Sequence, residues 1–82
     1  YNLGLLLQQL GRLDEAEAEL RAAVTLEPNS LEMLYALADH LLRRGRAADA
    51  RQLAEQIIAA HPGERVGHDL KAAAERSLGG QR

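Results

Sequence analysis

The sequence predicts an all-α fold built from pairs of helices, and its composition and its internal repeat carry this prediction. Leu and Ala supply most of the hydrophobic residues, and both are strong helix formers. Strand-forming Val, Ile and Thr are scarce, and Tyr1 and Tyr35 are the only aromatic residues. Several residue types also recur at a spacing of 34, which indicates a repeated unit of two helices.

The repeat period is visible in glycine, alanine, leucine and proline alike. Sets of these residues stand 34 positions apart: Gly11, Gly45 and Gly79; Ala16 and Ala50; Pro28 and Pro62; Leu3-Gly4 and Leu37-Ala38. Because one period is seen through several residue types, chance explains it poorly. We therefore expect consecutive helix–turn–helix units.

The first predicted unit spans residues 1–29. Its first helix covers residues 1–10 and has apolar residues at i, i+3, i+4 and i+7: Leu3, Leu6, Leu7 and Leu10. Gly11 ends this helix, because glycine tolerates a positive φ. The second helix covers residues 13–26, with these residues on its buried side: Leu13, Ala16, Leu20, Ala23 and Val24. Pro28 then breaks the chain, because it keeps the residue before it out of the α region.

The second predicted unit spans residues 30–63. Ser30 is expected to cap its first helix, residues 31–44, which Gly45 ends. The buried residues expected in this helix are Leu34, Leu37, Ala38 and Leu41. Those expected in its partner, residues 47–60, are Ala50, Leu53, Ala54, Ile57 and Ile58. His61-Pro62-Gly63 breaks the chain again.

The last predicted helix covers residues 64–78 and is expected to close the array, with one apolar and one charged side. Its apolar side consists of Val66, Leu70, Ala73, Ala74 and Ser77. We expect Val66 and Leu70 to pack near Leu53 and Ile57. Lys71 stands at a nominally buried place but should be exposed to water. Residues 79–82 are predicted to form a flexible tail.

These residues resemble the tetratricopeptide repeat over about residues 1–63. The matching pattern in the first unit is Leu3-Gly4-x-x-Leu7, Gly11, Ala16-x-x-x-Leu20, Ala23 and Pro28. In the second unit it is Leu34-x-x-Leu37-Ala38-x-x-Leu41, Gly45, Ala50-x-x-x-Ala54 and Pro62. The first helix starts late relative to the family pattern, so we expect further repeats or a tag before it. The resemblance implies a helical solenoid of about five helices.

The sequence offers little chemistry, and we expect no enzyme, cofactor or metal site. No two of His40, His61 and His68 form the i, i+4 pair of a helical zinc site, and we interpret all three as surface or boundary residues. Ten basic and twelve acidic residues nearly cancel, which argues against nucleic acid or anionic membranes held by bulk charge. Without cysteine or an apparent signal segment, the cytoplasm is favoured.

Short charge clusters have structural explanations. Acidic residues at the start of the helix over residues 13–26 complement its dipole, and Glu17 can pair with Arg21 at i, i+4. Arg43, Arg44 and Arg46 surround Gly45, where cations suit a helix C-terminus. Phosphate contact by these three arginines is an alternative that the sequence supports weakly.

The resemblance implies that the first helix of each unit lines a concave face that holds a partner. The candidate residues on that face are Asn2, Leu5, Gln8, Gln9, Tyr35, Asp39, Leu42 and Arg43. Tyr35 suits an interface, because it offers an apolar ring with a polar tip. Leu5 and Leu42 lie off the apolar stripes, and two interpretations stay open. They form an exposed docking patch, or they pack on neighbouring helices.

The predicted function is a non-catalytic scaffold that binds a peptide or protein. Two alternatives stay open. The chain could self-assemble through its first helix, because no helix before it covers Leu3, Leu6, Leu7 and Leu10. It could also be an appendage that brings substrate to the catalytic domain of a larger enzyme. The sequence names no ligand for any of these functions.

Overall fold

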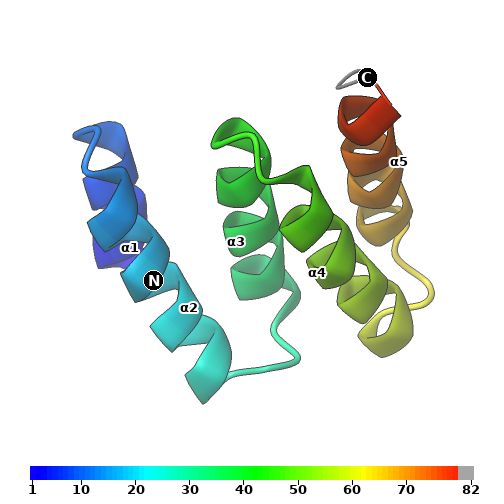
Figure 1. Cartoon of the computed structure of the whole chain (residues 1–82). Helices are drawn as coiled ribbons and strands as arrows, with labels where there is room; N and C mark the ends of the chain where they lie inside the picture. Colours follow the sequence, from blue (N-terminus) through cyan, green and yellow to red (C-terminus); the bar gives the residue numbers. More distant parts are fainter. Residues whose placement is uncertain (80–82) are drawn as a thin grey trace.

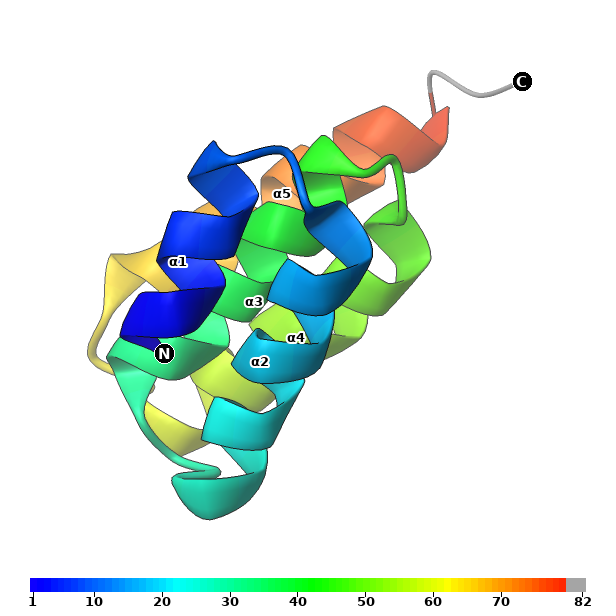
Figure 2. The ribbon, with the colours of Figure 1, turned by 90° about the vertical axis from the view of Figure 1, so that its left-hand side faces the viewer.

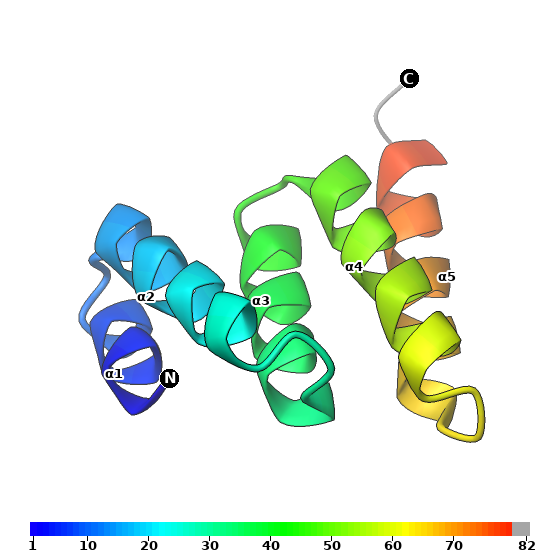
Figure 3. The ribbon, with the colours of Figure 1, turned by 90° about the horizontal axis from the view of Figure 1, so that it is seen from below.

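The computed structural model describes residues 1–79 and contains helices but no strand within that range. The helices are α1 (Asn2–Gln9), α2 (Leu13–Leu26), α3 (Leu31–Arg43), α4 (Ala47–Ala60) and α5 (Arg65–Gly79). They lie side by side in chain order across the molecule (Figure 1). Figure 3 shows the same order from below. The predicted all-α array of about five helices is therefore confirmed.

Each helix packs chiefly on the helices next to it in the sequence, and α3 also touches α5. The molecule is thin as a result, with dimensions of 31 × 29 × 15 Å. The bounds of α2 and α4 are those predicted, whereas α5 begins and ends one residue later than expected. Gly79 is thus the last residue of α5 and not the first of a tail, since a helix end tolerates glycine at small cost. The rest of the predicted tail lies outside the described residues.

Each unit has one turn that joins its two helices, and the two turns have the same geometry. Gly11 and Gly45 have φ angles of 78° and 76°, which residues other than glycine rarely adopt. After each glycine, a backbone N–H donates 2.9 Å back to the preceding helix, from Arg12 to Leu7 and from Arg46 to Leu41. The predicted role of both glycines as helix terminators is confirmed.

The array has two distinct ends. The turns at Gly11 and Gly45 lie at one end, which we call the Gly-turn end (Figures 1 and 2). The α2–α3 and α4–α5 loops, with Pro28 and Pro62, lie at the other, which we call the Pro-loop end. There the Ser30 hydroxyl accepts a 3.3 Å hydrogen bond from the Met33 N–H, so Ser30 caps α3 as predicted.

The core consists of two neighbouring clusters of buried residues. The first contains Leu20, Ala36, Leu37, Leu41, Ala47, Ala50 and Ala74. The second contains Leu34, Ala38, Ala54, Ile57 and Leu70. Val24, Leu42 and Leu53 are partly buried and pack on both. Most of the predicted core is confirmed, but Leu13 is exposed, because it begins α2 at the Gly-turn end.

Helix α1 buries less of its apolar stripe than α3 does. Leu3 and Leu6 are each 51% exposed and Leu10 is 62% exposed. Leu7 is buried, so the expectation that it too would be uncovered is wrong. The reason is position, because α1 packs chiefly on α2 whereas α3 lies between α2 and α4. Leu7 lies on the side of α1 that meets the rest of the array.

His40 contradicts its interpretation as a surface or boundary residue. It is fully buried in α3, and neither ring nitrogen has a hydrogen-bond partner. His40 stands one repeat period after Leu6, but Leu6 is exposed on α1, whereas His40 is buried because α3 packs against α2, α4 and α5. The expectation holds for the other two histidines, because His61 is partly buried and His68 is exposed.

Helix α5 packs on the second unit as predicted. Leu70 is buried in the cluster that contains Ile57, and Val66 and Leu53 pack against the same cluster. Lys71 is partly exposed, and its Nζ lies 3.6 Å from Glu55 Oε2. Leu70 and Val66 thereby cover apolar surface of α4, while Lys71 stays at the surface.

Candidate functional site

The predicted site residues lie on α1 and on one side of α3. Asn2 and Gln9 are exposed on α1, and Gln8 is partly buried. Tyr35 and Asp39 are one helical turn apart on α3, and Arg43 is one turn further along. The three side chains of α3 therefore form one stripe. We refer to the side of the array formed by α1, α3 and α5 as the first-helix face.

Leu5 and Leu42 differ from the other candidates, because both are partly buried. Leu5 packs against the first core cluster, and Leu42 packs against both clusters. These contacts correspond to the second interpretation of the two leucines, in which they pack on neighbouring helices. Their exposed portions still border the first-helix face.

Asp39 and Arg43 pair with each other. Arg43 Nε lies 2.9 Å from Asp39 Oδ2, and the Arg43 side chain is well exposed. An i, i+4 pair of this kind on an exposed helix adds only a few tenths of a kcal/mol to stability. Both groups can therefore exchange their mutual contact for one with a partner at little cost.

Two of the three arginines around Gly45, Arg44 and Arg46, are bound to acidic residues of α2. Arg44 Nη2 lies 2.8 Å from Asp14 Oδ1, and Arg46 Nη1 lies 2.8 Å from Glu17 Oε2. The predicted pairing of Glu17 with Arg21 is confirmed at 3.0 Å. These arginines are thus neutralised by their own chain, which weakens the alternative of phosphate contact.

Glu17 is the acceptor shared by these groups, and its pKa reflects them. Partial burial raises the pKa of the Glu17 carboxyl, but hydrogen bonds from Arg21 and Arg46 lower it more, so the net shift is downward. The hydrogen bond to Glu17 also raises the pKa of Arg46. Both shifts favour the charged forms of the two groups, which is what their ion pair at the Gly-turn end requires.

A groove of about 550 Å³ opens at the Pro-loop end, where α1, α3 and α5 begin. We call it the tyrosine groove, and it is lined by Tyr1, Ser30, Leu31, Glu32, Tyr35, Glu64 and Val66. Its two aromatic residues stand 34 positions apart, so they occupy equivalent positions in the two repeat units. Of the predicted site residues, only Tyr35 lines the groove. Tyr1 could have been predicted as a site residue, because it stands one repeat period before Tyr35.

A smaller hollow of about 250 Å³ adjoins the groove, because Tyr1 lines both. We call it the side hollow, and it is lined by Tyr1, Glu19, Ala22, Ala23, Leu26, Glu27 and Met33. Tyr1 directly precedes α1, and the other residues come from α2, α3 and the α2–α3 loop. The two hollows therefore meet at Tyr1.

A family model described as tetratricopeptide repeat matches residues 1–65. The chain belongs to the tetratricopeptide repeat family. The match covers both helix pairs and stops at the first residue of α5, so the predicted family is confirmed. Comparison with curated proteins gives no match. Tetratricopeptide repeats generally mediate protein–protein interaction, which makes a protein partner the expected ligand class.

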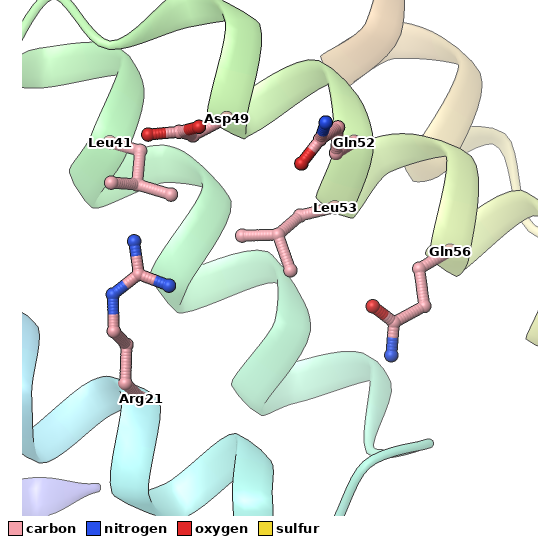
Figure 4. Close-up of a pocket in the computed structure, with 6 residues that line it drawn as sticks. All are labelled: Arg21, Leu41, Asp49, Gln52, Leu53 and Gln56. Atoms are coloured by element: carbon pink, nitrogen blue, oxygen red, sulfur yellow. The ribbon is translucent and has the colours of Figure 1, made fainter.

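A third hollow of this tetratricopeptide array lies among α2, α3 and α4 (Figure 4). It measures only about 150 Å³ and is lined by Arg21, Leu41, Asp49, Gln52, Leu53 and Gln56. Its one arginine, Arg21, is already bonded to Glu17. Because this hollow is small and mostly polar, we place the candidate site at the tyrosine groove.

The described part of this tetratricopeptide array holds no group of three or more His, Cys, Asp or Glu residues placed to bind a metal ion. Within the same residues, no helix has the length and apolar character needed to cross a membrane. We therefore take the first-helix face as the candidate site, with the tyrosine groove as the largest of the three hollows described above.

Proposed function

We propose that the chain is a non-catalytic scaffold that holds a peptide or protein on its first-helix face, with the tyrosine groove as the main contact. The observation that carries this proposal is the pair of repeat-related rings, Tyr1 and Tyr35, in a groove of about 550 Å³. Aromatic side chains in such grooves are frequent anchors of binding energy. Leu31 and Val66 add apolar walls, and Ser30 and Glu32 add polar groups.

The remaining candidate residues extend the proposed surface along the two helices. Asn2, Gln8 and Gln9 carry amides that can donate to and accept from a peptide backbone. Asp39 and Arg43 offer one charge of each sign. In this proposal Leu5 and Leu42 support the floor of the surface.

The test is selection of short random peptides displayed on phage against the immobilised chain, followed by affinity measurement with purified peptides. Tyr35→Ala should weaken binding by about tenfold or more, because a central aromatic anchor is lost. Leu13→Ala is the matched control, since Leu13 is 40% exposed and Tyr35 is 43% exposed but Leu13 lies at the Gly-turn end. Equal affinities of the native chain and Tyr35→Ala would remove the tyrosine groove as the site.

A second candidate function is self-association through α1. Leu3, Leu6 and Leu10 are exposed at i, i+3 and i+7, and α1 contains no charged residue that would oppose contact between two copies. Sedimentation velocity over a concentration series tests it. The native chain should form larger species as concentration rises, and Leu6→Gln/Leu10→Gln should not. A native chain that stays monomeric throughout contradicts this function and leaves the first one intact.

A further inference from the structure

We propose that the tyrosine groove binds a basic segment of a protein, in which a Lys or Arg stands next to an apolar side chain. This inference rests on the proposed function and adds the charge of the partner to it. Three observations support it. Acidic side chains without an ion pair gather at the two hollows, aromatic and apolar residues stand beside them, and most arginines pair with acidic residues elsewhere.

The unpaired carboxylates gather at the two hollows. Among the described residues, five acidic side chains take part in no ion pair: Glu19, Glu27, Glu32, Glu64 and Asp69. Glu32 and Glu64 line the tyrosine groove. Glu19 and Glu27 line the side hollow. Four of the five therefore line the two hollows that meet at Tyr1.

No basic side chain within residues 1–79 forms an ion pair with these four carboxylates. Within residues 1–79, only Arg65 and Arg76 lack an ion pair with an acidic side chain. Arg65 begins α5 but lines neither hollow, and Arg76 lies in the last turn of α5. Most paired arginines lie at the Gly-turn end, where they bind their own acidic neighbours. The formal net charge of −2 is therefore unevenly distributed, and the Pro-loop end is acidic.

The groove offers a cation more than charge alone. The ring faces of Tyr1 and Tyr35 can attract an ammonium or guanidinium group through their quadrupoles. Glu32 and Glu64 can accept charge-assisted hydrogen bonds from it. Leu31 supplies apolar surface for the aliphatic stem of a Lys or Arg side chain. The same carboxylates would repel an acidic segment, so the groove should bind basic segments more tightly than acidic ones.

The attraction between these carboxylates and a cation acts at the surface, because Glu32 and Glu64 are both exposed. Such attraction should decline with added salt, because the groove is open to solvent. A basic partner is therefore expected to bind more weakly as ionic strength rises.

The experiment uses the N-acetylated chain, so that the α-amino group of Tyr1 adds no positive charge at the groove. Short random peptides selected on this chain should be enriched in Lys and Arg. The best peptide should bind about tenfold more weakly to Glu32→Lys/Glu64→Lys, because attraction becomes repulsion. Glu15→Lys/Glu75→Lys is the matched control, since it makes the same change in net charge away from the groove. It should bind as the native chain does, and circular dichroism melts should show that both variants fold.

The outcomes separate this inference from the proposed function. Peptides without basic enrichment that lose affinity for Tyr35→Ala overturn the inference and leave the scaffold function standing. Equal weakening by Glu32→Lys/Glu64→Lys and by the control double variant also overturns it, because bulk charge then explains the effect. Failure to select any peptide, or selected peptides indifferent to Tyr35→Ala, overturns the proposed function together with the inference.

Discussion

Arg46 Nη1 lies 2.8 Å from both carboxylate oxygens of Glu17, and this contact joins the α3–α4 turn to α2 of the preceding unit. Arg21 and Arg44 add further hydrogen bonds to the same carboxylate, at 3.0 and 3.2 Å. The Glu17 side chain is only 13% exposed, so its bonds are better shielded from water than those of a surface pair. One carboxylate thus binds three guanidinium groups, and those of Arg44 and Arg46 connect it to the second repeat unit.

Replacing Glu17 by Gln should destabilise the fold by about 1 kcal/mol near neutral pH, because three arginines lose their shared anion. The folded-state pKa of Glu17 lies below its ordinary value of 4.5. Its contribution is therefore fully present above that value and is lost as pH falls through the lowered pKa. Urea unfolding at neutral and acidic pH measures this. The stability difference between the native chain and Glu17→Gln should shrink on acidification.

Glu15→Gln is the control for this experiment, since Glu15 pairs only with exposed Arg12 in the same unit. It should change stability by no more than a few tenths of a kcal/mol. Equal losses for the two variants would contradict a special role for Glu17.

Replacing His40 by Leu should stabilise the fold by about 1 kcal/mol. Its imidazole is fully buried with neither ring nitrogen hydrogen-bonded, and a buried polar group without a partner costs about 1–3 kcal/mol. Leucine has a similar volume, and its side chain has no polar atom that needs a partner. Urea unfolding of His40→Leu is compared with His68→Leu, which changes an exposed side chain. A loss of stability in His40→Leu would contradict this prediction.

Replacing Gly67 by Ala should destabilise the fold by about 1–3 kcal/mol, although alanine favours helices. A Cβ atom there would lie 2.9 Å from the side chains of Ile57 and Ile58 and 3.2 Å from the Ile58 backbone nitrogen. Gly79→Ala is the matched control in the same helix, because nothing lies within 4 Å of its added Cβ. Thermal melts should move down for Gly67→Ala and not for Gly79→Ala. A higher melting temperature for Gly67→Ala would show that α5 can move away from α4.

Replacing Leu70 by Asp should destabilise the fold by about 3 kcal/mol or more, because an unpaired charge would face the second core cluster. Ala72→Asp places the same charge on the exposed side of α5 and serves as control. Circular dichroism melts of both variants measure the difference. If Leu70→Asp melts as Ala72→Asp does, α5 contributes little to the stability of the array.

The local order of the chain could be predicted because Gly and Pro mark its helix ends. The bounds of α2 and α4 followed from Gly11, Gly45, Pro28 and Pro62, whose effects act on adjacent residues. The burial of His40 could not be predicted in this way, because polar residues are assigned to the surface by default.

The candidate site was harder to predict than the fold, since it depends on contacts between distant residues. The tyrosine groove combines the starts of three helices, and no local pattern places Glu64 beside Tyr1. The bond from Arg46 to Glu17 spans 29 residues and likewise has no local signal. The spacing of Tyr1 and Tyr35 was the one feature of the groove that the sequence displayed.

The packing of each helix on its neighbours in the sequence has a kinetic consequence. Few contacts require closure of a long loop, so we expect rapid folding that begins with any adjacent pair of helices. Helix α3 packs against α2, α4 and α5, whereas α1 packs chiefly against α2. Backbone amides of α1 should therefore exchange with deuterium first and those of α3 last, so that the array opens inward from its first helix.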